Sequence, residues 1–281
     1  MIDNKFSKKS VPLILSDTTL RDGLRASHFS PSLSEKEMLF SALVRSCIPI
    51  IEVGYVIHGT QDLELLGALD PIASRESSLA LLCHANAADI KTAAAALKPF
   101  PKPRLNLYLN VGKLQLSYQE PMATKALARH AMDMVALAAT LCDDVQLTLM
   151  DATRCPLDDL ITIAKSALKY GLGTLCISDT MGCATPMSMS QLINRLSAVV
   201  DLESVHLGVH CHNDNHLANE IALIAHQCGV AIIEGTIAGI GERKGGVNLV
   251  EIMRRHHLKS EALELIESDY LKLIEAADAN S

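Results

Sequence analysis

The sequence predicts a (β/α)8 TIM barrel, and two observations support this fold class. Short apolar segments rich in Val, Ile and Leu recur along the 281 residues with little polar alternation, which is typical of parallel strands covered on both faces. Amphipathic helical stretches separate these segments. Strand–helix units repeated eight times in about 250 residues match the size of such a barrel. A doubly wound open sheet is the alternative architecture.

The expected elements follow one another at regular intervals. The strands are predicted over residues 12–16, 50–54, 79–83, 105–110, 145–149, 174–178, 205–210 and 232–236. After the first strand, the capping-box pattern Ser34–Glu37 predicts a helix that runs to about residue 46. Thr185 followed by Pro186 predicts another helix start, with an N-cap residue and a proline in the first turn.

No linker or low-complexity segment divides the chain, so the barrel is expected to occupy residues 1–258 as the catalytic domain. Residues 259–281 are expected to add a C-terminal helix. Its apolar positions are Leu263, Ile266, Leu271, Leu273 and Ile274. This apolar face could dock on the barrel or on a second subunit, and a homodimer is expected.

Composition excludes several classes of protein. The formal charge of −7 comes from interspersed acids and bases, which argues against a nucleic-acid surface. Eight cysteines without a CxxC pair predict reduced, buried thiols rather than a zinc knuckle or a disulfide framework. No signal peptide and no run of about 18 apolar residues is visible, so a cytoplasmic protein without membrane contact is expected.

Polar residues gather where the predicted strands end, which is where barrel enzymes place their chemistry. His210 and His212 are two residues apart, so an extended chain turns both imidazoles to one face and Cys211 away. Together with a carboxylate from another strand, Asp22, they could hold a divalent ion and leave positions open for substrate. The alternative is that these are polar strand ends satisfied by their neighbours.

Further residues at the same ends suggest supporting roles. Arg21 could stabilise a developing oxyanion, or could form a plain ion pair with Asp17 or Glu52. The residues expected to orient the metal ligands are Asp17, Glu52, Asp179 and Asn213. The glycine-rich loop "GIGERKGG" could hold an anion on its backbone amides. The loop residues expected to do so are Gly241, Glu242, Gly245 and Gly246.

These motifs make the family recognisable. The chain resembles the DRE-TIM metallolyase superfamily through "DTTLRDG", "IEVGY", "DATR", "DTMGCATP", "HCHND" and "GERKGG", which occur in the family's order. It is most similar to the Claisen-condensing branch, the isopropylmalate and homocitrate synthases, which join acetyl-CoA to a 2-oxo acid. The resemblance implies that Asp22, His210 and His212 hold a divalent ion (Mg, Mn or Zn). It also implies that Arg21 stabilises the enolate or alkoxide oxygen and that Thr185 binds the oxo acid carboxylate.

The chain departs from that branch at residues expected to face the substrate. Arg25 replaces a usual Gln, Gln115 a His, Met150 a Glu, and Gly246 the Asn typical of isopropylmalate synthases. We therefore expect an altered substrate, with Arg25 reading an extra anionic group such as a second carboxylate or a phosphonate. The synthases also carry C-terminal subdomains, whereas this chain ends soon after the expected barrel, as do lyases and aldolases of the superfamily.

Three functions remain open from the sequence. The first is a metal-dependent acyltransferase that condenses acetyl-CoA, or a similar acyl-CoA, with a 2-oxo acid. Its general base could be His84, Tyr118 or a residue of another subunit. The second is an aldolase or lyase that cleaves a 2-oxo-4-hydroxy acid or a 3-hydroxyacyl-CoA. The third is a non-catalytic binding protein on the same fold.

Overall fold

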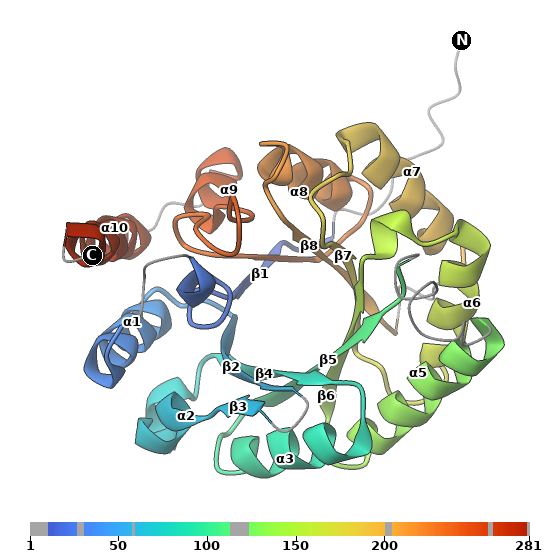
Figure 1. Cartoon of the computed structure of the whole chain (residues 1–281), viewed down its shortest axis with the longest axis horizontal. Coiled ribbons are helices and arrows are strands. Elements are labelled where there is room, and N and C mark those ends of the chain that lie inside the picture. Colours follow the sequence, from blue (N-terminus) through green and yellow to red (C-terminus); the bar gives the residue numbers. More distant parts are fainter. Residues whose placement is uncertain are drawn as a thin grey trace.

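Eight parallel strands close into a barrel surrounded by helices (Figure 1). The computed structural model describes residues 11–26, 31–57, 60–112, 124–199, 204–257 and 261–279. The barrel strands are β1 (Ile14–Asp17), β2 (Ile50–Ile57), β4 (Ser78–His84), β5 (Pro103–Asn110), β6 (Asp144–Met150), β7 (Thr174–Asp179), β8 (His206–Cys211) and β9 (Ile232–Gly235). Strand β1 pairs in parallel with both β2 and β9, which closes the barrel and confirms the predicted fold class.

All eight predicted strands are present, with boundaries that shift by three residues or fewer. The sequence reading missed β3 (Thr60–Asp62), which pairs antiparallel with the end of β2. Its three residues, Thr-Gln-Asp, contain no apolar side chain, so no hydrophobic pattern could reveal it.

Helices cover the outside of the barrel (Figure 1). They are α1 (Leu33–Arg45), α2 (Glu64–Ala68), α3 (Ala87–Leu97), α5 (Thr124–Ala139), α6 (Leu157–Ala167), α7 (Pro186–Ser197), α8 (Ala218–Gln227), α9 (Leu249–Arg255) and α10 (Glu261–Ala279). Short 3-10 turns occur at Gly23–Arg25, Pro71–Ser74 and Ala152–Arg154. None of the described helices is both long enough and apolar enough to cross a membrane.

The N-terminal caps confirm one predicted helix start and correct another. Thr185 caps α7 and Pro186 is its first residue, as expected. The capping box of α1, however, is formed by Ser32 and Glu35 rather than Ser34 and Glu37. The Ser-x-x-Glu pattern occurs twice here, and the extended backbone that an N-cap requires falls at Ser32.

The two faces of each strand have different partners. On β5, Leu105 and Leu107 belong to the main hydrophobic core beneath the helices, whereas Arg104 and Asn106 form polar contacts within the barrel. Polar side chains therefore face the barrel interior, beside a small apolar cluster of described residues. That cluster consists of Ile50, Ala80, Ala231 and Ile232, with Ile14 packed against it.

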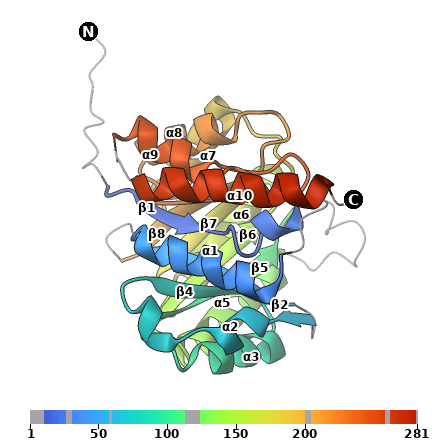
Figure 2. The ribbon, with the colours of Figure 1, turned by 90° about the vertical axis from the view of Figure 1, so that its left-hand side faces the viewer.

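Helix α10 lies alongside α1 on the outside of the barrel (Figures 1 and 2). Its predicted apolar position Ile266 is buried, whereas Leu271 is exposed. The side chains of Leu263, Leu273 and Ile274 lie outside the described residues. The most buried side chain of the described part of this helix is Tyr270, which the sequence reading did not single out.

The Tyr270 hydroxyl packs against Gly23, one residue after Asp22. A methyl group at position 23 would lie 2.8 Å from the Tyr270 oxygen and 3.4 Å from Thr19 Cγ2. We expect Gly23→Ala to lower the free energy of unfolding by about 1–3 kcal/mol, because this buried contact must give way. Urea denaturation measures the loss, and adding Tyr270→Phe should recover part of it. An unchanged unfolding midpoint in Gly23→Ala would contradict the close approach of α10 to this turn.

All eight cysteines are free thiols. Cys83, Cys142, Cys176 and Cys211 are buried, and burial raises the pKa of each of these four thiols. The exposed pair is Cys47 and Cys183. Buried, protonated thiols act here as small core side chains.

Candidate metal centre

A cavity of about 500 Å³ opens at the carboxyl ends of the barrel strands. Every barrel strand or the turn that follows it contributes to its wall. The lining residues are Arg21, Asp22, Arg25, Ile57, Leu82, Asn106, Tyr108, Thr148, Met150, Ser178, Thr180, Met181, His210, His212, Glu234, Glu242 and Arg243.

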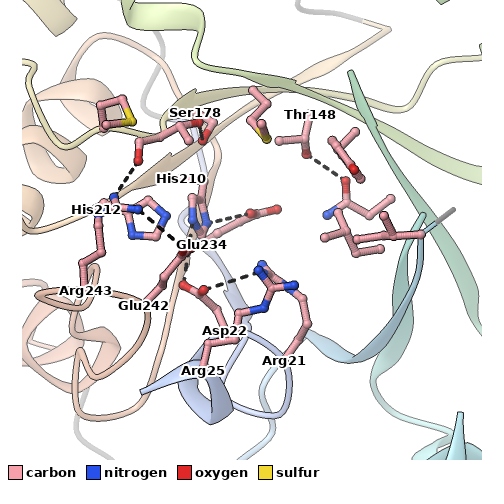
Figure 3. Close-up of a pocket in the computed structure, with 17 residues that line it drawn as sticks. Arg21, Asp22, Arg25, Thr148, Ser178, His210, His212, Glu234, Glu242 and Arg243 are labelled. Atoms are coloured by element: carbon pink, nitrogen blue, oxygen red, sulfur yellow. Dashed lines mark hydrogen bonds and ion pairs between the residues drawn. The ribbon is translucent and has the colours of Figure 1, made fainter. Parts of the chain in front are cut away.

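Three of these residues converge as a possible ligand set. Each of Asp22, His210 and His212 offers one ligand atom, and these atoms all lie within 4.8 Å of one another. Figure 3 shows the carboxylate and the two imidazoles turned toward one another. His210 Nε2 lies 4.0 Å from Asp22 Oδ2. The predicted side-chain alternation is confirmed, since both imidazoles face the cavity while Cys211 lies in the hydrophobic core.

The turn after β1 holds Asp22 in place. The backbone amides of Arg21, Asp22 and Gly23 all donate to the carbonyl of Thr18, and Thr18 in turn donates to Gly235 of β9. This compact turn brings the carboxylate beside β8, although Asp22 and His210 are far apart in the sequence. Only 2% of Asp22 is exposed.

The electrostatics of Asp22 and His212 suit a divalent cation. For His210, burial lowers the pKa, but Glu234 and the charge of Asp22 outweigh it and raise that pKa above its usual value. Burial raises the pKa of Asp22, but the charges of Arg21 and the histidines outweigh it and hold that pKa below its usual value. Burial, followed by the charge of His210, lowers the pKa of His212 to about 4. The ring is therefore neutral near pH 7, which is the form that ligates a metal. The Nδ1 atoms of His210 and His212 are both buried without a hydrogen-bond partner in the described part of the chain.

Glu234 supports His210 from the neighbouring strand, and the sequence reading missed it. His210 pairs with Glu234 in the register of β8 and β9. Its Nδ1 lies 3.2 Å from Glu234 Oε2 in an ion-pair contact, whereas its Nε2 faces Asp22. The signal was present as a charged residue inside the apolar strand "IIEG".

A chain of buried polar groups continues from Glu234 to the opposite end of the barrel. Gln146 donates to Glu234 Oε1, and Arg104 donates to the Gln146 oxygen at 2.7 Å. Arg104 also binds both oxygens of Asp144. Since each amide atom of Gln146 already has a fixed partner, Glu234 is held in one orientation.

We expect Glu234→Gln to weaken Mn²⁺ binding about 10–100-fold, the usual cost of losing a group that orients a ligating histidine. The introduced side-chain amide has one accepting oxygen and one donating nitrogen. If its oxygen accepts from His210, its nitrogen faces the donating amide of Gln146. Calorimetric titration with Mn²⁺ measures the change. Glu220→Gln, at an exposed position on α8, is the matched control. Equal affinities in the two variants would contradict this role for Glu234.

Arg21 forms a buried ion pair beside Asp22. Its Nε donates to Glu52, and its Nη1 lies 3.5 Å from Asp22 Oδ1. Asn106 donates to the other oxygen of Glu52 at 2.8 Å. The predicted ion pair with Glu52 is therefore present, and the same side chain lines the cavity.

Other predicted site residues are anchors of local structure rather than cavity-lining groups. Asp17 accepts from the amide and hydroxyl of Thr19, and Asp179 accepts from the Ala184 amide. Asn213 accepts from the first amide of α8. Thr185 accepts from Ser188 as the cap of α7 and does not line the cavity. Arg25, Met150 and Glu242 do line it.

The glycine-rich loop is shaped by its own backbone bonds. The amide of Gly245 donates to Glu242 and that of Gly246 donates to Gly239, which leaves neither amide free for an anion. Gly245 has a positive φ of 81°. Gly241 packs against Asp22, where a methyl group would lie 3.2 Å from its Oδ2. This loop therefore buttresses the turn that carries Asp22.

Of the residues predicted as a general base, only His84 is in the described part of the chain. Tyr118 lies outside the described residues, as does Gln115. His84 ends β4, where its Nδ1 lies 3.0 Å from the Asn86 amide and its ring lies 5.1 Å from that of Tyr108. Tyr108 lines the cavity, whereas His84 does not.

Fold and site together define a TIM barrel with a candidate divalent-metal centre at its carboxyl-terminal mouth. The family model described as HMGL-like matches residues 12–277. A protein named 2-isopropylmalate synthase from Stenotrophomonas maltophilia (strain K279a) is 35% identical over 241 residues, which cover 84% of this chain and 46% of that protein. The protein of the same name from Aquifex aeolicus is 33% identical over 240 residues, with the same coverage of both chains.

The chain belongs to the HMGL-like family, and its predicted membership in the DRE-TIM superfamily is confirmed. It spans about half the length of the curated relatives it matches. Among solved structures, the HMG-CoA lyase of Brucella melitensis superposes with a TM-score of 0.76 at 15% identity, covering 95% of this chain and 98% of that one. This similarity concerns the fold.

Proposed function

We propose that this chain is the catalytic barrel of a metal-dependent acyltransferase that condenses an acyl-CoA with a 2-oxo acid. The observation that carries the proposal is the convergence of Asp22, His210 and His212 beside the buried Arg21 within one cavity. The relatives named 2-isopropylmalate synthase support the direction of carbon–carbon bond formation.

Each residue has a defined task in this proposal. Asp22, His210 and His212 would hold a divalent ion, which supplies Lewis-acid polarisation of the substrate carbonyl when bound. Glu234, 3.2 Å from His210 Nδ1, would favour a proton on that nitrogen and so leave Nε2 to act as the ligand atom. Arg21 presents a permanent cation at the same position, where negative charge develops on the oxygen of the ketone under attack.

The remaining wall suits a small polar acceptor molecule. Thr148 and Ser178 place hydroxyl groups in the cavity between the metal centre and β5. In the reaction, the α-carbon of the acyl group loses a proton to a base and bonds to the ketone carbon of the oxo acid, whose oxygen takes up a proton and becomes a hydroxyl group. Hydrolysis of the thioester then releases free coenzyme A, which gives the reaction a measurable product.

A thiol-release assay with acetyl-CoA, Mn²⁺ and a panel of 2-oxo acids tests this function. We expect thiol release that depends on the oxo acid and stops when a chelator is added. Incubation with 2-oxo-4-hydroxy acids or 3-hydroxyacyl-CoA thioesters tests cleavage. Chelator-sensitive cleavage without any condensation would replace the synthase proposal by the lyase alternative. If the protein catalysed neither condensation nor cleavage, the third alternative, a non-catalytic binding protein, would replace the proposal.

A further inference from the structure

We propose that the acceptor 2-oxo acid carries a second anionic group at its far end, and that Arg25 binds this group. The inference rests on the proposed function, since it concerns the substrate of the same cavity. It starts from a difference among the three arginines of the cavity wall, which are Arg21, Arg25 and Arg243.

Two of these arginines already have acidic partners. Arg21 pairs with Glu52 and Asp22. Arg243 binds both oxygens of Asp214, at 3.0 and 2.9 Å, and also donates to the carbonyl of Thr180. Arg25 pairs with no acidic side chain in the part of the chain that the structure describes. Among the arginines of the described cavity wall, Arg25 is therefore the one whose guanidinium has no acidic partner.

Arg25 is also held in position for a ligand. Its Cζ lies 5.6 Å from the centre of the Tyr55 ring, within the range of a cation–π contact. Such a contact uses a face of the guanidinium and leaves its N–H groups free along the edge. This edge matches two oxygens of one carboxylate or phosphonate, which share the same recognition chemistry.

Arg25 lies three residues after Asp22, but its guanidinium reaches toward Tyr55 of β2. Three strands separate β4 from β8 in either direction around the closed barrel, so the two strands lie opposite each other. Leu82 of β4 lines the cavity and pairs in register with Tyr55 of β2, while His210 belongs to β8. Arg25 therefore adjoins the β2–β4 wall, across the cavity from the histidines.

A 2-oxo acid that places its carbonyl near His210 would extend its carbon chain toward Leu82 and Ile57 and end near Arg25. An uncharged tail would cover the guanidinium without offering it an acceptor, which costs binding free energy. A tail that ends in an anion would accept hydrogen bonds from the Arg25 guanidinium. The cavity thus favours dianionic over monoanionic oxo acids of the same length.

The test compares binding and turnover of matched pairs. The dissociation constants of 2-oxoglutarate and 2-oxopentanoate, which both contain a five-carbon chain, are measured by calorimetry on the Mn²⁺-loaded full chain. A second pair, 3-phosphonopyruvate and 2-oxobutyrate, shows whether a phosphonate serves better than a carboxylate. We expect at least about tenfold tighter binding of the dianionic member of one pair or both.

The decisive variant is Arg25→Gln, with Arg75→Gln as the control for loss of an exposed guanidinium elsewhere. We expect Arg25→Gln to abolish the preference by weakening the binding of the dianionic acids, while the affinity for the monoanionic acids stays unchanged or increases. Equal binding of both classes by the unaltered protein, or a preference that survives Arg25→Gln, would overturn the proposal. Preferential binding without thiol release would contradict the synthase function alone, whereas thiol release without preference would contradict only this inference.

Discussion

Replacement of His212 by alanine is expected to abolish Mn²⁺ binding at micromolar ion and, with it, all chelator-sensitive turnover. His212 supplies one of the three converging ligand atoms, and its buried Nδ1 has no other hydrogen-bond partner in the described chain. The affinity loss should exceed about 100-fold, the upper range seen when only a group supporting a ligand is removed. Calorimetry and metal analysis of the purified variant measure it.

His206→Ala is the matched control for this variant. His206 begins the same strand, β8, but lies exposed at its opposite end. It should leave metal content and turnover unchanged. If His212→Ala retained the metal content of the unaltered protein, the proposed ligand set would be wrong.

Replacement of Arg21 by glutamine is expected to lower kcat about 100- to 1000-fold, the usual loss when a group that stabilises an oxyanion is removed. Metal affinity should change far less, because Asp22 and both histidines remain. The single variant also leaves Glu52 buried without its cation, which costs about 3–5 kcal/mol of stability. A fall in activity could therefore arise from unfolding alone.

The double variant Arg21→Gln/Glu52→Gln separates the two effects. It removes both charges of the buried pair, so it should recover most of the unfolding free energy while kcat stays low. Urea denaturation and steady-state kinetics on the same preparations provide the two readouts. Recovery of kcat together with stability would show that Arg21 serves the fold and has no part in the reaction.

The strands of the barrel were predictable because each has an apolar face that packs against the helices. Their inward faces were harder to interpret. On β5, Arg104 and Asn106 alternate with leucines. Their partners Gln146 and Glu52 are on other strands, so these contacts depend on the register and arrangement of the strands around the barrel. Tyr270 was missed for a similar reason, since its contact with Gly23 joins opposite ends of the chain.

The candidate site was predictable where local geometry determines it. The spacing of His210 and His212 places both rings on one face, and Asp22 follows a strand end. Glu234 could not be assigned because its role depends on the register between β8 and β9. The sequence also does not show that the amides of Gly245 and Gly246 are bonded within their own loop, although an anion site on those two residues would require free amides.

The central claim is that one divalent cation is shared by Asp22, His210 and His212. Anomalous diffraction at the manganese edge, from crystals grown with Mn²⁺, tests it most directly. The account predicts one strong peak about 2.2 Å from the Asp22 carboxylate and from a nitrogen of each imidazole. Two results at a saturating concentration of Mn²⁺ would contradict the claim. One is the absence of an anomalous peak among these three side chains, and the other is a peak that only one of them contacts.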